Sequence, residues 1–304
     1  MRRPFPRAWK GAALSLLLIA AAPASAPVLR EVAWTDPASD VALITTQRPG
    51  ECLARTDALI ETGRALFRSP QLLGGPAARV GLSCEACHTE GRVNVHFLLP
   101  ELTDRPGMVD VTSEWASKVR GDGVANPAPI PDLVGVARKG TFGSHGERSL
   151  ETFVKSVIVD EFQGHEPTPR AFEGLIAYLR ALDPAACAPD GRLTLATAAD
   201  EVRRALAAAR VNAEAGDVET SRALRLAAQD AMARLAERLP APAFNADRRR
   251  FEALSRELGA ADVAGGFGPA WMARFDAAVA RVQRRERWTY FNPEVLRAAL
   301  IKSR

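Results

Sequence analysis

The chain has 304 residues, four cysteines and a formal net charge of +4 at pH 7. Its excess of positive charge belongs to the N-terminus, because residues 1–24 contain four basic residues and no acidic one. The other ~280 residues are neutral overall and suffice for one large domain or two modest ones. The basic pI of the whole chain is therefore not a property of the folded body.

Residues 1–24 predict an export signal. A positive stretch over residues 2–10 precedes an apolar stretch over 11–22, and Ala22-Pro23-Ala24 offers a small-x-small cleavage site. An uncleaved N-terminal anchor is the alternative. No later apolar run approaches membrane length, so we expect no membrane span in the mature chain. The expected location is periplasmic or otherwise exported, where nucleic acid is not an expected partner.

Composition changes sharply near residues 187–195. Residues 25–189 have a net charge of −5 and residues 190–304 one of +5, while alanine and arginine become frequent and Pro/Gly turns become rare. The change predicts an N-terminal extension over 25–51, a first domain over 52–188 and a second over 190–304.

Hydrophobic periodicity predicts an all-α protein. In the first domain, residues 56–67 and 169–182 carry apolar side chains at three- and four-residue steps, and Asp183-Pro184 ends the second segment. The second domain reads as an α-helical hairpin or bundle. Its expected helices cover 195–213, 218–239, 245–258 and 270–287, with a short one after Pro293.

The strongest chemical signal is Cys84-Glu85-Ala86-Cys87-His88. Two thiols at this spacing can form thioethers with the haem vinyl groups, and the next imidazole can ligate the iron. A zinc site would need two more closely spaced ligands, and a thioredoxin-like dithiol would sit in a βαβ pattern that is missing here. We predict one covalent haem c on Cys84 and Cys87, with His88 as the proximal iron ligand.

The remaining cysteines, Cys52 and Cys187, lie just before the first helix of the first domain and just after its last one. In an oxidising compartment, a disulfide between them would tie the two ends of this domain together. Two free thiols, or pairing with another chain, are the alternatives. We predict the intramolecular bond because two leftover cysteines in an exported protein usually pair.

The first domain resembles a known family. Its first helix with Gly63 and Leu66-Phe67, the Cys-x-x-Cys-His run and the last helix with residues 175–179 resemble a class I c-type cytochrome domain. More narrowly, three segments are similar to the bacterial di-haem cytochrome c peroxidase and MauG family. They are Ile130-Pro131-Asp132-Leu133-Val134-Gly135-Val136-Ala137, Thr141-Phe142-Gly143-Ser144-His145-Gly146 and Ser149-Leu150-Glu151. The likeness covers residues 55–185 and implies a cytochrome c-like fold.

The chain departs from that family in two ways. It has one haem motif where the di-haem peroxidases have two, and the methionine position implied by the resemblance falls on or near Val157, which cannot ligate iron. The candidates for the sixth ligand are Met108 and, as an alternative, His145; an open or water-bound iron is also possible. His96 is expected on the proximal side, and His165 in an exposed turn.

Secondary roles follow from the same interpretation. The loop over residues 94–100 is expected to accept the free imidazole proton of the proximal ligand. Arg92, Arg120, Trp115 and the weaker candidate Arg79 could hydrogen-bond the haem propionates, with a solvated surface as the alternative for each. In the second half, the arginine runs 248–250 and 281–287 read as solvated helix faces. Its aromatic residues are expected in the core, with an exposed docking patch as the alternative.

The sequence therefore predicts an exported c-type cytochrome that transfers single electrons to or from a periplasmic redox protein or enzyme, with no catalytic residue assigned. A haem peroxidase-like enzyme or subunit with an open distal site is an alternative. A further alternative makes residues 190–304 a protein-interaction module and the haem domain structural or sensory.

Overall fold

The structure is a computed structural model that describes residues 29–143, 146–260 and 267–302. It is mostly helical, which confirms the all-α expectation at this level. The export signal predicted over 1–24 and His145 lie outside the described residues. Among the helices of the described residues, none combines the length and the apolar character that crossing a membrane requires.

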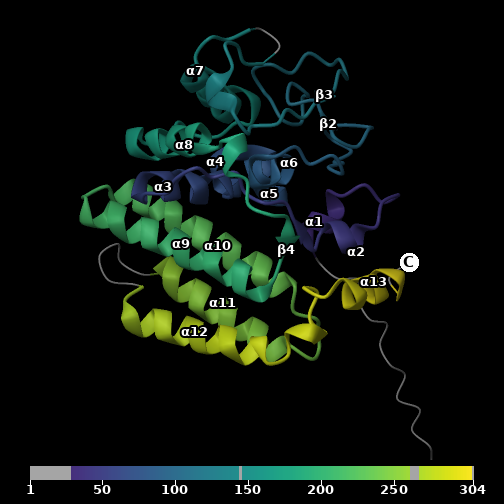
Figure 1. The fold of residues 1–304 in the computed structure, drawn as a ribbon, viewed down its shortest axis with the longest axis vertical. Coiled ribbons are helices and arrows are strands. Elements are labelled where there is room, and N and C mark those ends of the chain that lie inside the picture. Colours follow the sequence, from purple (N-terminus) through teal and green to yellow (C-terminus); the bar gives the residue numbers. More distant parts are fainter. Residues whose placement is uncertain (1–28, 144–145, 261–266, 303–304) are drawn as a thin grey trace, which may run out of the picture.

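The long helices form stacked layers (Figure 1). Helix α8 (Pro169–Ala181) packs on α3 (Ala58–Phe67), which in turn lies on the antiparallel pair α9 (Leu195–Glu214) and α10 (Val218–Glu237). Helices α11 (Asn245–Ala260) and α12 (Pro269–Gln283) cover the other side of that pair. The helices predicted from periodicity are thus confirmed, with ends displaced by a few residues.

The other elements are short. The remaining α-helices are α1 (Arg30–Ala33), α2 (Val41–Ile44), α4 (Pro70–Leu73), α5 (Gly75–Val80), α6 (Cys84–Cys87), α7 (Leu150–Ser156) and α13 (Pro293–Lys302). The 3-10 turns are η1 (Thr89–Gly91), η2 (Val136–Arg138), η4 (Pro184–Ala186) and η5 (Glu286–Trp288), and η3 (Val157–Glu161) is a π-helix. Two antiparallel two-residue pairs join β1 (Gln47–Arg48) to β4 (Gly191–Arg192), and β2 (Met108–Val109) to β3 (Ala128–Pro129).

Local capping explains where the main helices begin. The Asp57 carboxylate accepts from the first backbone N–H groups of α3, and Thr168 caps α8, whose first residue is a proline. Thr194 and Thr197 cap α9 reciprocally, and Asp217 caps α10. These residues satisfy N–H groups that have no partner within their own helix.

Helices α3 and α8 cross at two glycines. A Cβ atom placed on Gly63 would lie 1.9 Å from the carbonyl oxygen of Gly174 and 2.7 Å from the Cα of Leu175. The backbones therefore approach more closely than any side chain on Gly63 would permit. The group nearest to Gly63 is thus the backbone of Gly174 and not a side chain.

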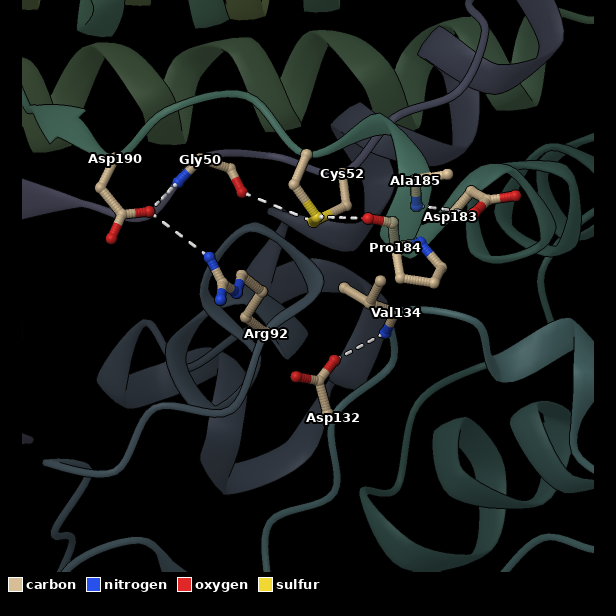
Figure 2. The surroundings of a disulfide bond; sticks show 10 residues. Gly50, Cys52, Arg92, Asp132, Val134, Asp183, Pro184, Ala185 and Asp190 are labelled. Atoms are coloured by element: carbon tan, nitrogen blue, oxygen red, sulfur yellow. Dashed lines mark hydrogen bonds and ion pairs between the residues drawn. A yellow bond between two sulfur atoms is a disulfide. The ribbon is translucent and has the colours of Figure 1, made fainter.

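The disulfide predicted between Cys52 and Cys187 is confirmed, and it lies in a tight seam between two segments (Figure 2). The Asp183 N–H donates to the Cys52 carbonyl at 2.7 Å, and the Ala188 N–H donates to the Glu51 carbonyl at 3.0 Å. The β1–β4 pair continues this seam. The segment before Cys52 is thus held against the junction of the two halves.

Candidate haem site

The Cys-x-x-Cys-His run forms one short helical turn. Ser83 precedes α6, both cysteines lie in α6, and His88 is the residue that ends it. Positions i and i+3 share a helix face, so Cys84 and Cys87 lie on the same side of the turn that His88 ends. Cys87 is buried, and Cys84 and His88 are partly exposed. Both cysteines of the motif are free thiols.

Both thiols face apolar surroundings. Cys87 belongs to a buried apolar cluster, which we call the cysteine cluster, and Cys84 packs against it. Its buried members are Trp34, Leu73, Ala77, Leu82, Cys87, Phe97, Leu99, Leu102, Ala116, Ile130 and Phe162. Cys84 also packs against a second cluster that contains Ile176 and Leu179 of α8. The motif thus lies where α8 and the loops after α6 meet.

Burial sets the protonation of these groups. It raises the pKa of the Cys84 thiol to about 12 and also raises that of Cys87, so both are protonated at neutral pH. Burial lowers the pKa of His88 from 6.5 to about 4, and the backbone of Pro131 opposes this shift. The imidazole is therefore neutral at pH 7, which is the form that ligates a metal.

The proximal imidazole lacks the hydrogen bond expected from residues 94–100. His88 Nδ1 is buried without a hydrogen-bond partner within the described residues. The backbone group that influences the imidazole belongs to Pro131, in the proline-rich loop. Asn94 instead holds the loop to α6, because its side chain donates to the Ala86 carbonyl at 2.9 Å. The hydrogen bond expected between His88 and residues 94–100 is therefore absent from the described residues.

These residues fit a covalently bound haem. The two free thiols lie on one face of a turn with apolar walls that a neutral imidazole ends, while the other two cysteines are joined to each other. In the part of the chain that the structure describes, one ring nitrogen of His88 makes no hydrogen bond that would hold the ring in place. Ligation of the iron through the other nitrogen would fix the orientation of the ring. Cys84 and Cys87 would hold such a haem, and His88 would ligate its iron.

The candidates for the sixth ligand lie in different places. Val157, the position implied for methionine by the family resemblance, packs against the cysteine cluster and begins the π-helix η3. Met108 lies in β2, partly exposed, and its neighbour Val109 packs against that cluster. His165 is exposed, as predicted, and His96 is partly exposed. The ligand roles of Met108 and His145 stay predictions.

The residues proposed for the propionates already have protein partners or are exposed. Arg120 donates to Glu161 at 2.9 Å and to Ser156 at 2.7 Å, next to η3. Arg92 forms an exposed ion pair with Asp190, and Trp115 packs against the cysteine cluster. Arg79 is exposed. Arg120 and Trp115 thus remain the two of these side chains that lie close to the apolar surroundings of the motif.

Behind the motif lies a buried ion-pair network that the sequence analysis missed. Arg68, which is 6% exposed, pairs with Glu90, which is 2% exposed. Arg68 also lies 3.6 Å from Glu85 of the motif and 3.3 Å from Glu51. Arg48 of β1 is the second partner of Glu90. The face of α6 that points away from the two cysteines is therefore held by charged side chains.

Glu90 has an unusual backbone. Its φ of 54° lies in the left-handed region, which non-glycine residues rarely adopt. Its N–H donates to the Glu85 carboxylate at 3.0 Å, and its own carboxylate is paired with Arg68 and Arg48. The ion pairs thus hold the turn that directly follows His88 in a conformation costing about 1–2 kcal/mol.

The network extends into the helical half. Glu201 of α9 pairs with Arg48 and lies 3.2 Å from Arg234 of α10. Burial alone would raise the pKa of Glu201, but the three surrounding arginines hold it well below its ordinary range. Burial raises the pKa of Glu85 to about 8, although Arg68 opposes the shift. Glu201 is thus ionised at pH 7.

A cleft of about 140 Å³ lies beside this network. It is lined by the N-terminal segment, by the back of α6 and by α9 and α10, including Trp34, Arg68, Ala86, Glu201 and Arg238. Arg68 Nε and Glu85 Oε2 make no hydrogen bond within the described residues. Both side chains line a cleft wide enough for water, the ordinary partner of such atoms.

Comparisons with protein families, curated proteins and solved structures found no match to this chain.

Proposed function

We propose that this protein is an exported c-type cytochrome with one covalently bound haem that transfers single electrons to or from a periplasmic redox protein or enzyme. One observation carries the proposal. The two motif thiols are free on one turn against an apolar cluster, while the other two cysteines are consumed in a disulfide. The pairing leaves the attachment thiols available in an oxidising compartment.

Each residue of the motif has a distinct role. Cys84 and Cys87 anchor the haem through thioethers, and the neutral His88 imidazole donates an electron pair to the iron. When bound, the haem supplies a one-electron step between ferric and ferrous iron. The apolar side chains around the thiols exclude water, which lowers the local polarity and so tunes the reduction potential. No substrate is turned over.

The first experiment tests covalent attachment. The chain is produced in a bacterial host that matures c-type cytochromes, and the haem is extracted with acidified acetone. We expect the haem to stay on the denatured chain, and the Cys84→Ser/Cys87→Ser variant to lose it. The matched Cys52→Ser/Cys187→Ser variant should keep it. A colourless wild-type protein, or one that binds zinc in place of haem, would contradict the proposal.

A second candidate function, peroxide reduction at an open iron, is favoured by one observation. Val157 packs against the cysteine cluster at the position where the family resemblance implies a methionine. A low-spin ferric spectrum supports the electron carrier, whereas a high-spin spectrum with rapid peroxide reactivity supports the enzyme. Met108→Ala and His145→Ala assign the ligand: the variant that turns a low-spin spectrum high-spin has lost it. If neither changes the spectrum, both assignments are wrong.

A further inference from the structure

An arginine patch forms where α11 begins and α12 ends. Buried Asp247 in the first turn of α11 accepts from Arg250 at 3.2 Å and from Arg281 at 3.0 Å, and it also pairs with Arg285. Arg285 stacks over the Phe244 ring at 4.4 Å. This single carboxylate fixes the relative positions of arginines from two helices that are more than thirty residues apart in the sequence.

Further arginines surround this centre without acidic partners. Arg249, Arg284 and Arg287 are exposed, and none forms an ion pair within the described residues. Arg284 donates only to a carbonyl of its own helix, and Arg287 stacks on Trp288 at 5.0 Å. The carboxylates nearby in sequence are Glu252 and Glu286, and Glu286 accepts the Leu195 backbone N–H. Arginines thus outnumber carboxylates across the patch.

The arginines at the start of α11 oppose ordinary helix stabilisation, whereas those at the end of α12 lie where the backbone dipole favours positive charge. Helix N-termini favour acidic residues because the backbone dipole is positive there. Helix α11 instead carries Arg248, Arg249 and Arg250 directly after Asp247 in its first turns. The backbone therefore adds to the positive potential of the arginines, and stability alone gives no reason for the run. A surface of this kind attracts an anionic partner.

An exposed aromatic side chain lies at the edge of the patch. Trp288 is 57% exposed, whereas its neighbours Tyr290 and Phe291 are buried. All three were expected in the core, with an exposed docking patch as the alternative, and Trp288 is the one that lies at the surface. Tryptophan beside cationic residues is typical of surfaces that lie at the headgroup level of a bilayer, because its ring is amphipathic.

The place of the patch in the fold argues against a redox partner. Helices α11 and α12 lie on the side of α9 and α10 that faces away from α3, α8 and the haem motif (Figure 1). A protein docked on the patch would be separated from α6 by the α9–α10 layer. A surface that only anchors the molecule does not need to lie near α6, and it leaves the half that carries the proposed haem site free to meet a redox partner.

We propose that this patch, Arg248–Arg250 of α11 with Arg281, Arg284, Arg285, Arg287 and Trp288 at the end of α12, binds an anionic phospholipid surface. Guanidinium groups donate bidentately to phosphate oxygens, and the exposed indole inserts among the headgroups. Binding of this kind is peripheral and requires no membrane-spanning helix. It also does not depend on the haem, so it can be tested separately from the proposed electron transfer.

The experiment uses the haem-loaded mature chain and sedimented vesicles. Vesicles of phosphatidylcholine alone are compared with vesicles that contain phosphatidylglycerol. We expect binding only to the second kind, and we expect it to weaken as salt is added. The Arg249→Gln/Arg284→Gln/Arg287→Gln variant should partition at least about tenfold less. Trp288→Ala should reduce binding further.

A matched control removes three charges elsewhere. Arg55, Arg105 and Arg222 are exposed and lie outside the patch, so the Arg55→Gln/Arg105→Gln/Arg222→Gln variant should bind as the parent does. Equal loss in both triple variants would mean that only net charge matters and would overturn the proposal. Failure of the parent to bind acidic vesicles would overturn it too, even if it bound an acidic protein or DNA. Unchanged thermal melting confirms that each variant is folded.

Discussion

Different interactions stabilise the interior of each half of this molecule. The helical half has a continuous core of leucine, alanine and aromatic side chains shared by α9, α10, α11 and α12. In the half that carries the proposed haem site, residues 29–188, here called the haem half, residues 89–149 contain only 3-10 turns and two-residue strands in the described part. Few of their backbone hydrogen bonds are therefore regular. That half is fixed by two smaller apolar clusters together with a disulfide, a glycine crossing and buried ion pairs.

The change in composition near residues 187–195 does not separate two independently stabilised units. Leu66 of α3 and Ala171 of α8 belong to the apolar core of the helical half. Arg48 and Glu201 join β1 to α9 behind the haem motif. The electrically opposite halves thus share a core and a charge network, so we expect changes on either side of the boundary to affect both.

The largest effect is expected at the α3–α8 crossing. Gly63→Val would place a Cβ atom 1.9 Å from the Gly174 carbonyl oxygen, and backbone cannot yield as a flexible side chain can. Forcing the helices apart should cost about 4 kcal/mol or more in the free energy of unfolding. Urea denaturation followed by circular dichroism measures this loss.

Gly191→Ala is the control for that variant. No atom lies within 4 Å of a Cβ placed on Gly191, so its stability should change by less than about 1 kcal/mol. If Gly63→Val unfolded only the haem half and left the helical half at its original stability, the shared core would not couple the two regions, contrary to the comparison above.

The next effect concerns Glu201, which joins the halves through charge. Glu201→Gln leaves Arg48 and Arg234 without their shared carboxylate in a buried site. Breaking a buried pair in this way costs about 3–5 kcal/mol. The exposed pair between Arg274 and Glu257 provides the control, because Glu257→Gln should have almost no effect. Equal effects in the two variants would refute a structural role for the network.

The Glu201 effect should depend on pH with a defined sign. Burial alone would raise the pKa of Glu201 above its ordinary value of 4.5, but Arg48, Arg234 and Arg68 together lower it. A carboxylate whose pKa is lower in the folded state stabilises the fold at pH values above its pKa in the unfolded chain. This stabilisation is lost as the pH falls. The difference in unfolding free energy between wild type and Glu201→Gln should thus shrink below about pH 4.5. A constant difference would contradict this account.

Removing the disulfide should have a somewhat smaller effect. Cys52 and Cys187 are 135 positions apart, so their bond restricts a long loop in the unfolded chain. Replacing both with serine should lower the free energy of unfolding by about 2–5 kcal/mol. The helical half should be affected less than the haem half, which proteolysis at low urea can resolve. Unaltered protease resistance in the haem half would refute this.

The sequence predicted well what depends on local pattern. The helices over 58–67, 169–181 and 195–237 follow from apolar spacing and capping residues, and the disulfide from two unpaired cysteines at the ends of one domain. The helices depend on neighbouring residues along the chain, and the disulfide on the number of cysteines left over. For that reason they needed no knowledge of the tertiary arrangement.

The network around Arg68 could not be predicted in the same way. Arg48, Glu90, Glu201 and Arg234 come from four separate segments, and nothing in the spacing of these residues indicates that they meet. The backbone of Pro131, which acts on the pKa of His88, likewise comes from a loop distant in sequence. Contacts between remote segments are set by how the helices pack, and periodicity does not specify that packing.

The smallest predicted effect tests the contact of α9 with α3 and α8, where the two halves meet. Asn212 of α9 is fully buried, and its amide donates to the Thr62 hydroxyl of α3 at 2.9 Å and accepts from Arg170 of α8 at 2.9 Å. Asn212→Ala removes both hydrogen bonds, leaves Arg170 Nε without its partner and should cost about 1–3 kcal/mol. Thr62→Val and the double variant complete a thermodynamic cycle. Because the hydrogen bond links the halves, we expect a coupling of about 1 kcal/mol, whereas additive effects would show that each half is stabilised independently.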